Sequence, residues 1–404
     1  MTETETAARG PLAGLRVLDL SRILAAPFAT QFLGDLGADI IKVERPGRGD
    51  DTRAWGPPYV TDADGRPTGE SAYYLSANRN KRSIALDMAN PQDAETIRRM
   101  ATRCDVLIEN FKVGGLAKYG LDYDSIRAVN PAIVYCSVTG FGQTGPNAHK
   151  PGYDLLAQGA GGIMSLTGEP DGEPMKVGVG IADIMCGMYA ANAIQAALIH
   201  RMKTGEGQHI DIALLDSQIS WLVNEGVNYL TSGEAPQRRG NQHPNIVPYQ
   251  VFECADGHAL VAVGNDAQFA RFVEMIGLPD LATDPRFIKN SDRLKNREAL
   301  IPLIAARLRQ MPKAEVVDGM ERVSVPGGEI NTIPEVFASD QVAARDMKIS
   351  VPYPGAAGGK VDLIGNPVRF SATPVTYRRH PPRCGEHTDE ILRELLGEDP
   401  DSGG

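Results

Sequence analysis

Asp183 stands where a carboxylate can do covalent chemistry. It follows the Gly/Val-rich segment 177–182 and opens a long run of small apolar residues, which places it at the N-terminus of a helix predicted over about 183–203. Backbone N–H groups and the helix dipole favour an ionised carboxylate there. Such a group can attack as a nucleophile, and amides without a partner can receive a developing oxyanion. From this segment alone, the simpler interpretation that Asp183 only caps its helix is favoured.

Two further segments carry residues suited to an anionic or aromatic ligand. Asn80 and Lys81 belong to the basic run 78–82 before a predicted strand; such a run can hold phosphates or form a solvated loop, and the loop is the commoner case. Asn110 and Phe111 close the next predicted strand, and ligands of parallel α/β sheets bind beyond the carboxyl ends of strands. Asn110 can hydrogen-bond a base on which Phe111 stacks, or the pair can be an ordinary strand exit.

Other polar residues on predicted loops allow more than one interpretation. Lys118, further along the loop after Phe111, can meet a phosphate, although a solvated lysine is the commoner case. Tyr153 and Asp154 are adjacent, and a Tyr–Asp pair can hydrogen-bond, carry protons or form a turn.

Motifs for metals, serine hydrolases and nicotinamide cofactors are absent. The seven histidines form no HExxH, and there is no GxSxG. The segment GAGGIM (159–164) lacks the last glycine of a dinucleotide fingerprint and does not clearly follow a strand. We therefore expect neither a metal nor a nicotinamide cofactor.

Composition limits the compartment and the partners. The formal net charge of -10 argues against a nucleic-acid partner. Five scattered cysteines without a CxxC pair fit a reducing compartment better than a disulfide framework or a zinc site. The N-terminal segment MTETETAARGPLAG lacks the pattern of an export or mitochondrial signal, and no apolar run reaches about 18 residues. We expect a cytoplasmic protein without a membrane partner.

The first half of the chain alternates strands and helices. A strand, a helix and a second strand within about 30 residues have the size of a parallel crossover unit. This pattern predicts a Rossmann-like, doubly wound parallel α/β sheet. The strands are expected at 15–21, 38–44, 83–88, 105–111 and 132–142, and the helices at 26–38, 91–103 and 123–130.

The second half predicts a smaller α/β domain. Segment 209–230 fits a strand or a helix, and the turn-rich segment 232–245 marks a boundary. A hairpin with Asp256-Gly257 as its turn is expected within 249–266. Helices are predicted at 266–277 and 293–309, and a short amphipathic helix near the C-terminus.

Taken together, the segments resemble the family III CoA-transferases, also called the CaiB/BaiF family. The matching pieces run in family order over nearly the whole chain, and the ordered set is highly specific. They include PLAGLRVLDLSRILAAPFATQFLGDLGADIIKVERPGRGD (11–50), NRNKRSIALDM (78–88), ENFKVGGLAKYGL (109–121), GYDLLAQGAGGIMSLTGEPDG (152–172), GVGIADIMCGMYA (178–190) and GEHTDEILRELLG (385–397).

The resemblance implies an enzyme with coenzyme A, as acyl-CoA, for its substrate. It reverses the interpretation of Asp183, which corresponds to the family's nucleophile and would form acyl-anhydride and aspartyl-CoA thioester intermediates. Tyr153 and Asp154 are carried over as further catalytic candidates. The implied CoA contacts are Arg22, Arg45, Asn80, Lys81, Asn110, Phe111, Lys118 and Lys150.

Departures from the family patterns narrow the expected activity. Tyr153 replaces a catalytic histidine of the racemases, and Leu24 replaces a glutamine of formyl-CoA transferase, so both activities are disfavoured. Segments 240–252, 256–272 and 330–342 look most like the succinyl-CoA-dependent branch. A loop with Arg238, Arg239 and His243 can meet the distal carboxylate of a dicarboxylic acid, or it can be a basic surface loop. A racemase or isomerase and a non-catalytic CoA-binding protein remain alternatives.

The resemblance also implies the architecture. Residues 1–225 would form the first part of the large CoA-binding domain and 226–325 the small domain, and 326–404 would return the chain to the large domain. Two chains would interlock as a homodimer.

Overall fold

The structure, a computed structural model, describes residues 10–398 and divides into two compact units. The large unit comprises 10–163, 176–234 and 341–398, and the small unit comprises 164–175 and 235–340. The domain boundaries expected at 225/226 and 325/326 stay a prediction.

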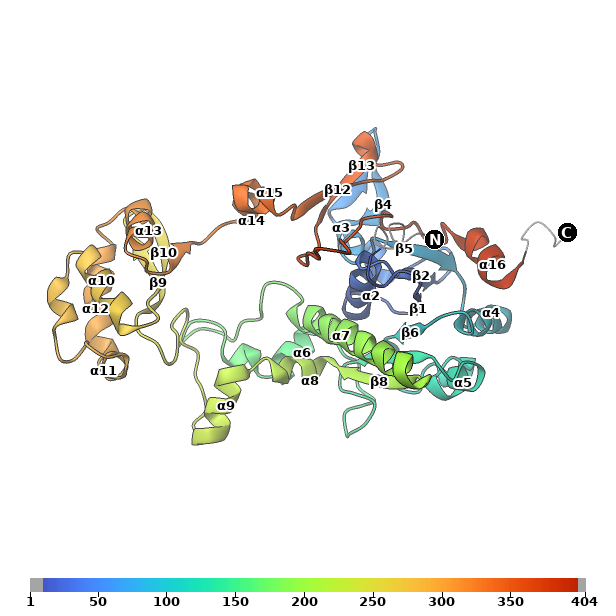
Figure 1. Cartoon of the computed structure of the whole chain (residues 1–404), viewed down its shortest axis with the longest axis horizontal. Coiled ribbons are helices and arrows are strands. Elements are labelled where there is room, and N and C mark those ends of the chain that lie inside the picture. The colour runs from blue at the N-terminus through green and yellow to red at the C-terminus, as the bar shows by residue number, and fades with distance from the viewer. Residues whose placement is uncertain (1–9, 399–404) are drawn as a thin grey trace. The chain divides into compact units, whose positions relative to one another are not determined.

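A six-stranded sheet with parallel pairings throughout organises the large unit (Figure 1). Its strands are β1 (Arg16–Asp19), β2 (Asp39–Glu44), β5 (Lys81–Ala85), β6 (Val106–Glu109), β7 (Val134–Thr139) and β8 (Gln208–Ala213). The spatial order is β5-β2-β1-β6-β7-β8, which is the doubly wound Rossmann order. The predicted fold class is thus confirmed, and the direction of winding reverses between β1 and β6.

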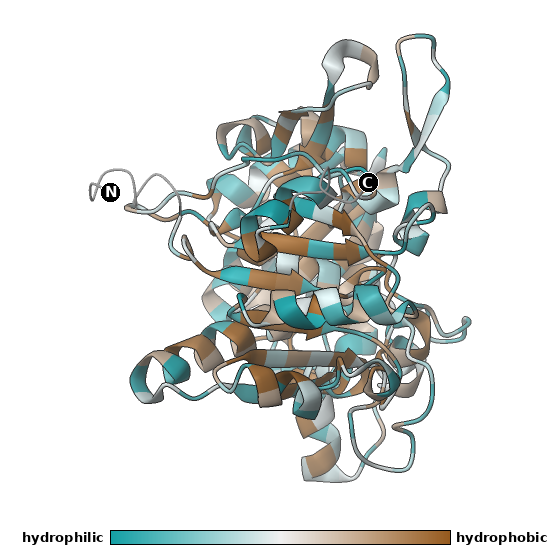
Figure 2. Ribbon diagram, turned by 90° about the vertical axis from the view of Figure 1, so that its right-hand side faces the viewer, coloured by the Kyte–Doolittle hydropathy of each residue, from teal (hydrophilic) through white to brown (hydrophobic). Residues whose placement is uncertain are grey.

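Buried residues on both faces of the sheet explain why its strands have continuous apolar runs. Val17 faces a core with α2 (Ala25–Asp35) and α7 (Ile181–Thr204), whereas Leu18 faces a core with α4 (Pro91–Ala101), α5 (Tyr123–Val129) and α16 (Thr388–Leu396). In Figure 2 the strands are mostly brown, while the helices carry both colours, as expected for a sheet between two helical layers.

Helix α7 packs along α2 in the core of the large unit. A Cβ on Gly187 would lie 2.4 Å from the carbonyl oxygen of Ala25, so this close approach requires a glycine. Contrary to expectation, α7 is long and apolar enough to cross a membrane. Half of its most apolar window is buried, however, as in the core helix of a globular unit, so this is weak evidence for a span.

Short elements complete the large unit. Segment 209–230, which fitted a strand or a helix, contains β8 followed by two helices. Two-stranded antiparallel pairs are formed by β3 with β4 and by β12 with β13. The additional elements are β3 (Tyr59–Thr61), β4 (Pro67–Ser71), α3 (Ala72–Leu75), α6 (Asp154–Ala160), α8 (Leu214–Ser220), α9 (Val223–Ser232), β12 (Lys348–Pro352) and β13 (Lys360–Ile364), with the short helix α15 (Asp340–Ala344) at the division between the units.

The small unit is an antiparallel sheet of order β11-β10-β9 packed with helices around its own core. The expected hairpin is present, but its two turn residues are Ala255 and Asp256, since Gly257 already pairs with Cys254. The predicted helix 293–309 is divided at Asn296. The elements are β9 (Tyr249–Cys254), β10 (Gly257–Ala262), α10 (Asp266–Met275), α11 (Asn290–Lys295), α12 (Arg297–Leu308), α13 (Lys313–Arg322), β11 (Gly327–Glu329) and α14 (Ile333–Ala338).

Candidate active site

A cavity of about 620 Å³ opens at the carboxyl ends of the parallel strands of the large unit. Residues that follow each of the six strands contribute to its wall, and doubly wound sheets bind ligands at this edge. The sequence-predicted residues that line it are Arg22, Leu24, Arg45, Asn110, Phe111, Lys118, Lys150, Tyr153 and Asp183.

The loop after β1 is held at the point where the sheet reverses its winding. Asn110 Oδ1 accepts from the backbone N–H of Arg22 at 2.9 Å, and Asn110 Nδ2 donates to the Arg22 carbonyl at 2.6 Å. Asn110, expected to bond a base, thus fixes backbone instead. The next residue, Ile23, has φ of +72°, which is strained for a β-branched side chain. Its N–H donates to Asp50 Oδ1 at 3.3 Å.

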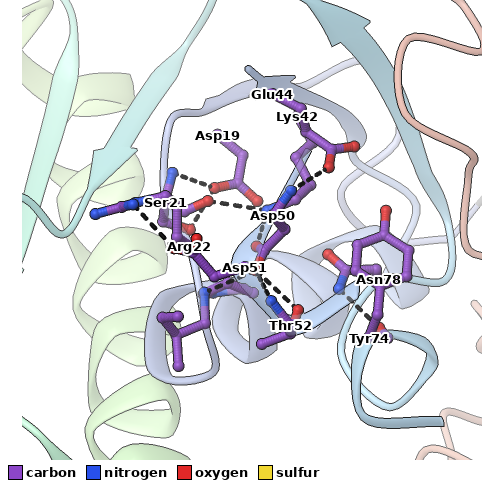
Figure 3. Close-up of polar contacts among 12 residues, drawn as sticks. Asp19, Ser21, Arg22, Lys42, Glu44, Asp50, Asp51, Thr52, Tyr74 and Asn78 are labelled. Carbon is purple, nitrogen blue, oxygen red and sulfur yellow. Dashed lines mark hydrogen bonds and ion pairs between the residues drawn. The ribbon is translucent and has the colours of Figure 1, made fainter. Parts of the chain in front are cut away.

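The buried ion pair of Lys42 and Asp50 contacts this loop (Figure 3). Lys42 Nζ donates to Asp50 Oδ2 and to the carbonyl of Ser21, both at 2.9 Å. The Lys42 ammonium offsets the burial of Asp50, and the pKa of that carboxyl falls to about 2. An ionised Asp50 is therefore available at neutral pH to accept from the loop.

Arginine and lysine side chains form part of the cavity wall, and such a set of cations suits a ligand with several phosphates. Arg22 also lies over the Phe111 ring, at 5.1 Å from its centroid. Sequence analysis missed Arg48 and Lys112, which line the same cavity. Both stand on loops after predicted strands, so the rule that ligands bind beyond carboxyl ends would have found them.

Asp183 lies in the first turn of α7, on the cavity wall, and is only 8% exposed. Within residues 10–398, neither of its carboxylate oxygens has a hydrogen-bond partner. Burial and the neighbouring charge of Asp154 raise the pKa of Asp183 to about 7. A desolvated carboxylate with free lone pairs that ionises near neutral pH is suited to nucleophilic attack.

The N-terminus of α7 is capped differently from what the sequence predicted. Asp183 is not the cap, because Gly180 holds that position. Asp154 Oδ1 instead accepts from the N–H of Ala182 at 2.8 Å and of Asp183 at 3.3 Å. The amides expected to receive an oxyanion are therefore already bonded, since a carboxylate from another helix satisfies them.

Tyr73, on α3, is a second residue that sequence analysis missed. Burial, followed by the charges of Asp183 and Asp154, raises the pKa of its hydroxyl to about 12. It therefore stays a neutral donor beside the two carboxylates. Tyr153, by contrast, is 60% exposed at the N-terminus of α6. No sequence motif marks Tyr73, and only the folded chain brings it near Asp183.

Asn80 and Lys81 do not line the cavity. Lys81 is fully buried, with Nζ 3.2 Å from Asp19 Oδ2, and Asn80 Nδ2 donates to Asp35 Oδ1 at 2.8 Å. They stand at the start of β5, the amino end of the strand, whereas the cavity opens at the carboxyl ends. Both side chains make buried polar contacts inside the large unit, and neither is included among the CoA contacts proposed below.

The remaining predicted residues belong to the small unit. Arg238 donates to the carbonyls of Glu169 and Gly172, which ties segment 164–175 to the rest of this unit. His243 packs against Tyr249. Among the described residues, no group of three His, Cys, Asp or Glu could hold a metal ion.

The fold and the site define a Rossmann-like α/β protein with a cavity that is lined by several cations and by one buried carboxylate suited to nucleophilic attack. The chain belongs to CoA-transferase family III, whose family model matches residues 12–388. The resemblance seen in the sequence is thereby confirmed: the protein is a CoA-transferase and acts on CoA thioesters.

Named relatives are similar along nearly their whole length. The chain is 50% identical over 385 residues to the succinate–glutarate CoA-transferase of Agrobacterium fabrum, covering 95% of this chain and 96% of that protein. It is 42% identical to the succinyl-CoA:glutarate CoA-transferase of Mus musculus, covering 96% and 86%. A crystal structure of a CaiB/BaiF family protein from Brucella suis superposes with a TM-score of 0.84 at 48% identity, covering 96% and 100%.

Proposed function

We propose that the protein transfers CoA from succinyl-CoA to a dicarboxylic acid, with Asp183 as the covalent nucleophile. The observation that carries this proposal is a buried carboxylate on the wall of a cavity lined by cations, whose two oxygens have no hydrogen-bond partner among the described residues. The relatives named for glutarate support the choice of donor and acceptor class.

The first half of the reaction activates the donor acid. An Asp183 oxygen attacks the thioester carbonyl, the C–S bond breaks, and CoA leaves as a thiolate, so that a mixed anhydride remains. The thiolate then attacks Cγ of Asp183 and expels succinate, which leaves an aspartyl-CoA thioester.

The second half returns CoA to the acceptor. An acceptor carboxylate attacks Cγ of Asp183 and releases the thiolate, and a new anhydride forms. The thiolate attacks the acyl carbonyl of that anhydride, and Asp183 leaves as a free carboxylate. The sequence consumes no water and no redox equivalent, and burial of Asp183 protects the anhydrides from hydrolysis.

Different residues of the cavity wall are proposed to bind different parts of CoA. The cations Arg22, Arg45, Arg48, Lys112, Lys118 and Lys150 are proposed to meet the phosphates, and Phe111 is proposed to stack on the base. Leu24, on the cavity wall, would contact the acyl chain. The expectation that Arg238, Arg239 and His243 meet the distal carboxylate of the acceptor stays a prediction.

A homodimer is proposed from the apolar surface of the large unit. Leu155, Ile199, Met202, Val227 and Leu230 are between 53% and 83% exposed on α6, α7 and α9. Such side chains suit an interface with a second copy. Light scattering should give twice the mass of the chain, and a monomer at micromolar concentration would contradict this proposal.

Mass spectrometry tests the covalent step directly. Intact protein mixed briefly with succinyl-CoA should gain a hydroxylamine-sensitive adduct on Asp183, and glutarate should discharge it. Asp183→Ala should gain none. Asp216 occupies the same position in the first turn of α8 and is exposed, so Asp216→Ala is the matched control and should label normally.

The outcome also separates transferase from racemase chemistry. Deuterium exchange at the acyl α-carbon without any adduct would overturn the proposed transfer and favour a racemase or isomerase.

A further inference from the structure

Helix α7 begins without a capping side chain of its own. Its cap position is Gly180, and the N–H groups of Ala182 and Asp183 are bonded by Asp154, which is 29 residues before Asp183 in the chain. The Asp154 carboxylate therefore holds the backbone of the first turn of α7, which carries Asp183.

Gln158 holds that carboxylate. Its Nε2 donates to Asp154 Oδ2 at 2.7 Å, and its Oε1 accepts from the N–H of Val177 at 2.8 Å. Gln158 is fully buried and stands four residues after Asp154, on the same face of α6. One amide thus joins α6, the Asp154 carboxylate and the segment that leads into α7.

We propose that Gln158 is a positioning residue for the transfer reaction, acting on Asp183 through Asp154. The inference rests on the proposed role of Asp183 as nucleophile. Gln158 does not line the cavity, so its effect is expected on the covalent step and not on the binding of CoA.

The hydrogen bond between Gln158 and Asp154 also fixes the position of the Asp154 charge near Asp183. The titratable groups facing this point are Asp154 on α6, Tyr73 on α3, and Asp183 and Cys186 on α7. The Asp154 carboxylate accepts three N–H groups, from Ala182, Asp183 and the Gln158 side chain, and these hold it in place. Without the Gln158 amide, Asp154 loses one donor and its fixed place beside Asp183.

Two substitutions at one position separate this role from simple packing. Gln158→Met keeps the volume and removes both hydrogen bonds. It should lower kcat about 10–100-fold and leave KM for succinyl-CoA within about 3-fold, as expected when geometry at the nucleophile is lost. Gln218→Met is the matched control, because Gln218 is equally buried on α8 and its amide nitrogen has no partner among the described residues. It should keep kcat.

Gln158→Glu gives a pH signature that packing alone would not. When the introduced carboxyl group is protonated it can donate to Asp154, and when it is ionised it repels Asp154. The activity of Gln158→Glu relative to the native protein should therefore fall as pH rises from about 5.5 to 8, on the order of 10-fold. A ratio independent of pH, together with native kcat in Gln158→Met, would overturn the proposal.

A readout without catalysis keeps the two proposals distinguishable. The difference in unfolding free energy between the native and Asp183→Asn proteins, followed against pH, reports the titration midpoint of Asp183. That midpoint should fall in a Gln158→Met background, since Asp154 is no longer held close. An unchanged midpoint counts against positioning, whereas a native protein that forms no adduct counts against the proposed function.

Discussion

The side chain of Asn110 holds both backbone polar groups of Arg22, accepting from its N–H at 2.9 Å and donating to its carbonyl at 2.6 Å. The two residues follow β6 and β1, the neighbouring strands between which the sheet reverses its winding. This bridge fixes the loop that carries Arg22 and the strained Ile23 into the cavity wall.

Removing the bridge should weaken CoA binding more than catalysis. Asn110→Ala deletes two hydrogen bonds worth about 1 kcal/mol each, so the Kd for CoA should rise about 5–30-fold by calorimetry while kcat changes less. Native affinity in Asn110→Ala would show that the loop needs no bridge.

Asp51 should oppose CoA binding. Its carboxylate pairs with Arg22 at 3.0 Å and with Arg48 at 2.9 Å, and it lines the cavity with both cations. Exposed pairs contribute about 0–1 kcal/mol, so phosphates can displace Asp51 at small cost. Asp51→Asn should lower the Kd for CoA about 2–5-fold at low salt, with the gain shrinking at high salt. A weaker complex would mean that Asp51 orients the two arginines.

Lys81 and Lys118 should behave in opposite ways, although both were expected to contact CoA. Lys81→Met leaves the buried Asp19 carboxylate without its ion-pair partner, so it should lower the free energy of unfolding in urea by about 3–5 kcal/mol. Its folded fraction should bind CoA normally. Lys118→Met removes an exposed cation from the cavity and should raise the Kd without changing stability. A stable Lys81→Met protein that lost CoA binding would contradict this division.

These contrasts show what the sequence could predict. Periodicity located the parallel strands. The family resemblance selected Asp183, Arg22 and Phe111, which line one cavity, and their roles stay a prediction. The sequence did not show that Asn80 and Lys81 stand at the amino end of β5, away from the cavity. A basic run before a strand looks the same whether its cations meet phosphates or buried carboxylates.

Partners from distant segments were beyond sequence reasoning for a physical reason. Asp154 caps α7, and Tyr73 approaches Asp183, only because the fold joins α6, α3 and α7. Helix-capping patterns are local, and a cap supplied from 29 residues away leaves no local signal.

Asp183 should cost the folded protein stability at neutral pH. Its pKa is raised from an ordinary value of 3.8 to about 7 by burial and by Asp154. Between these values the unfolded chain releases a proton that the folded protein keeps, so the contribution of Asp183 to stability is full below about pH 4 and is lost as pH rises to about 7. One pKa unit corresponds to about 1.4 kcal/mol.

Asp183→Asn should therefore be inactive and more stable. Its free energy of unfolding in urea should exceed that of the native protein by about 2–4 kcal/mol at pH 8, and by clearly less at pH 5. Asp216 is the third residue of α8, as Asp183 is of α7, but its side chain is exposed. Asp216→Asn should therefore change stability by less than about 0.5 kcal/mol at both pH values. An equal gain for Asp183→Asn at pH 5 and pH 8 would show that Asp183 is already ionised in the folded protein at pH 5, and that its charge is stabilised by a contact other than those around α7.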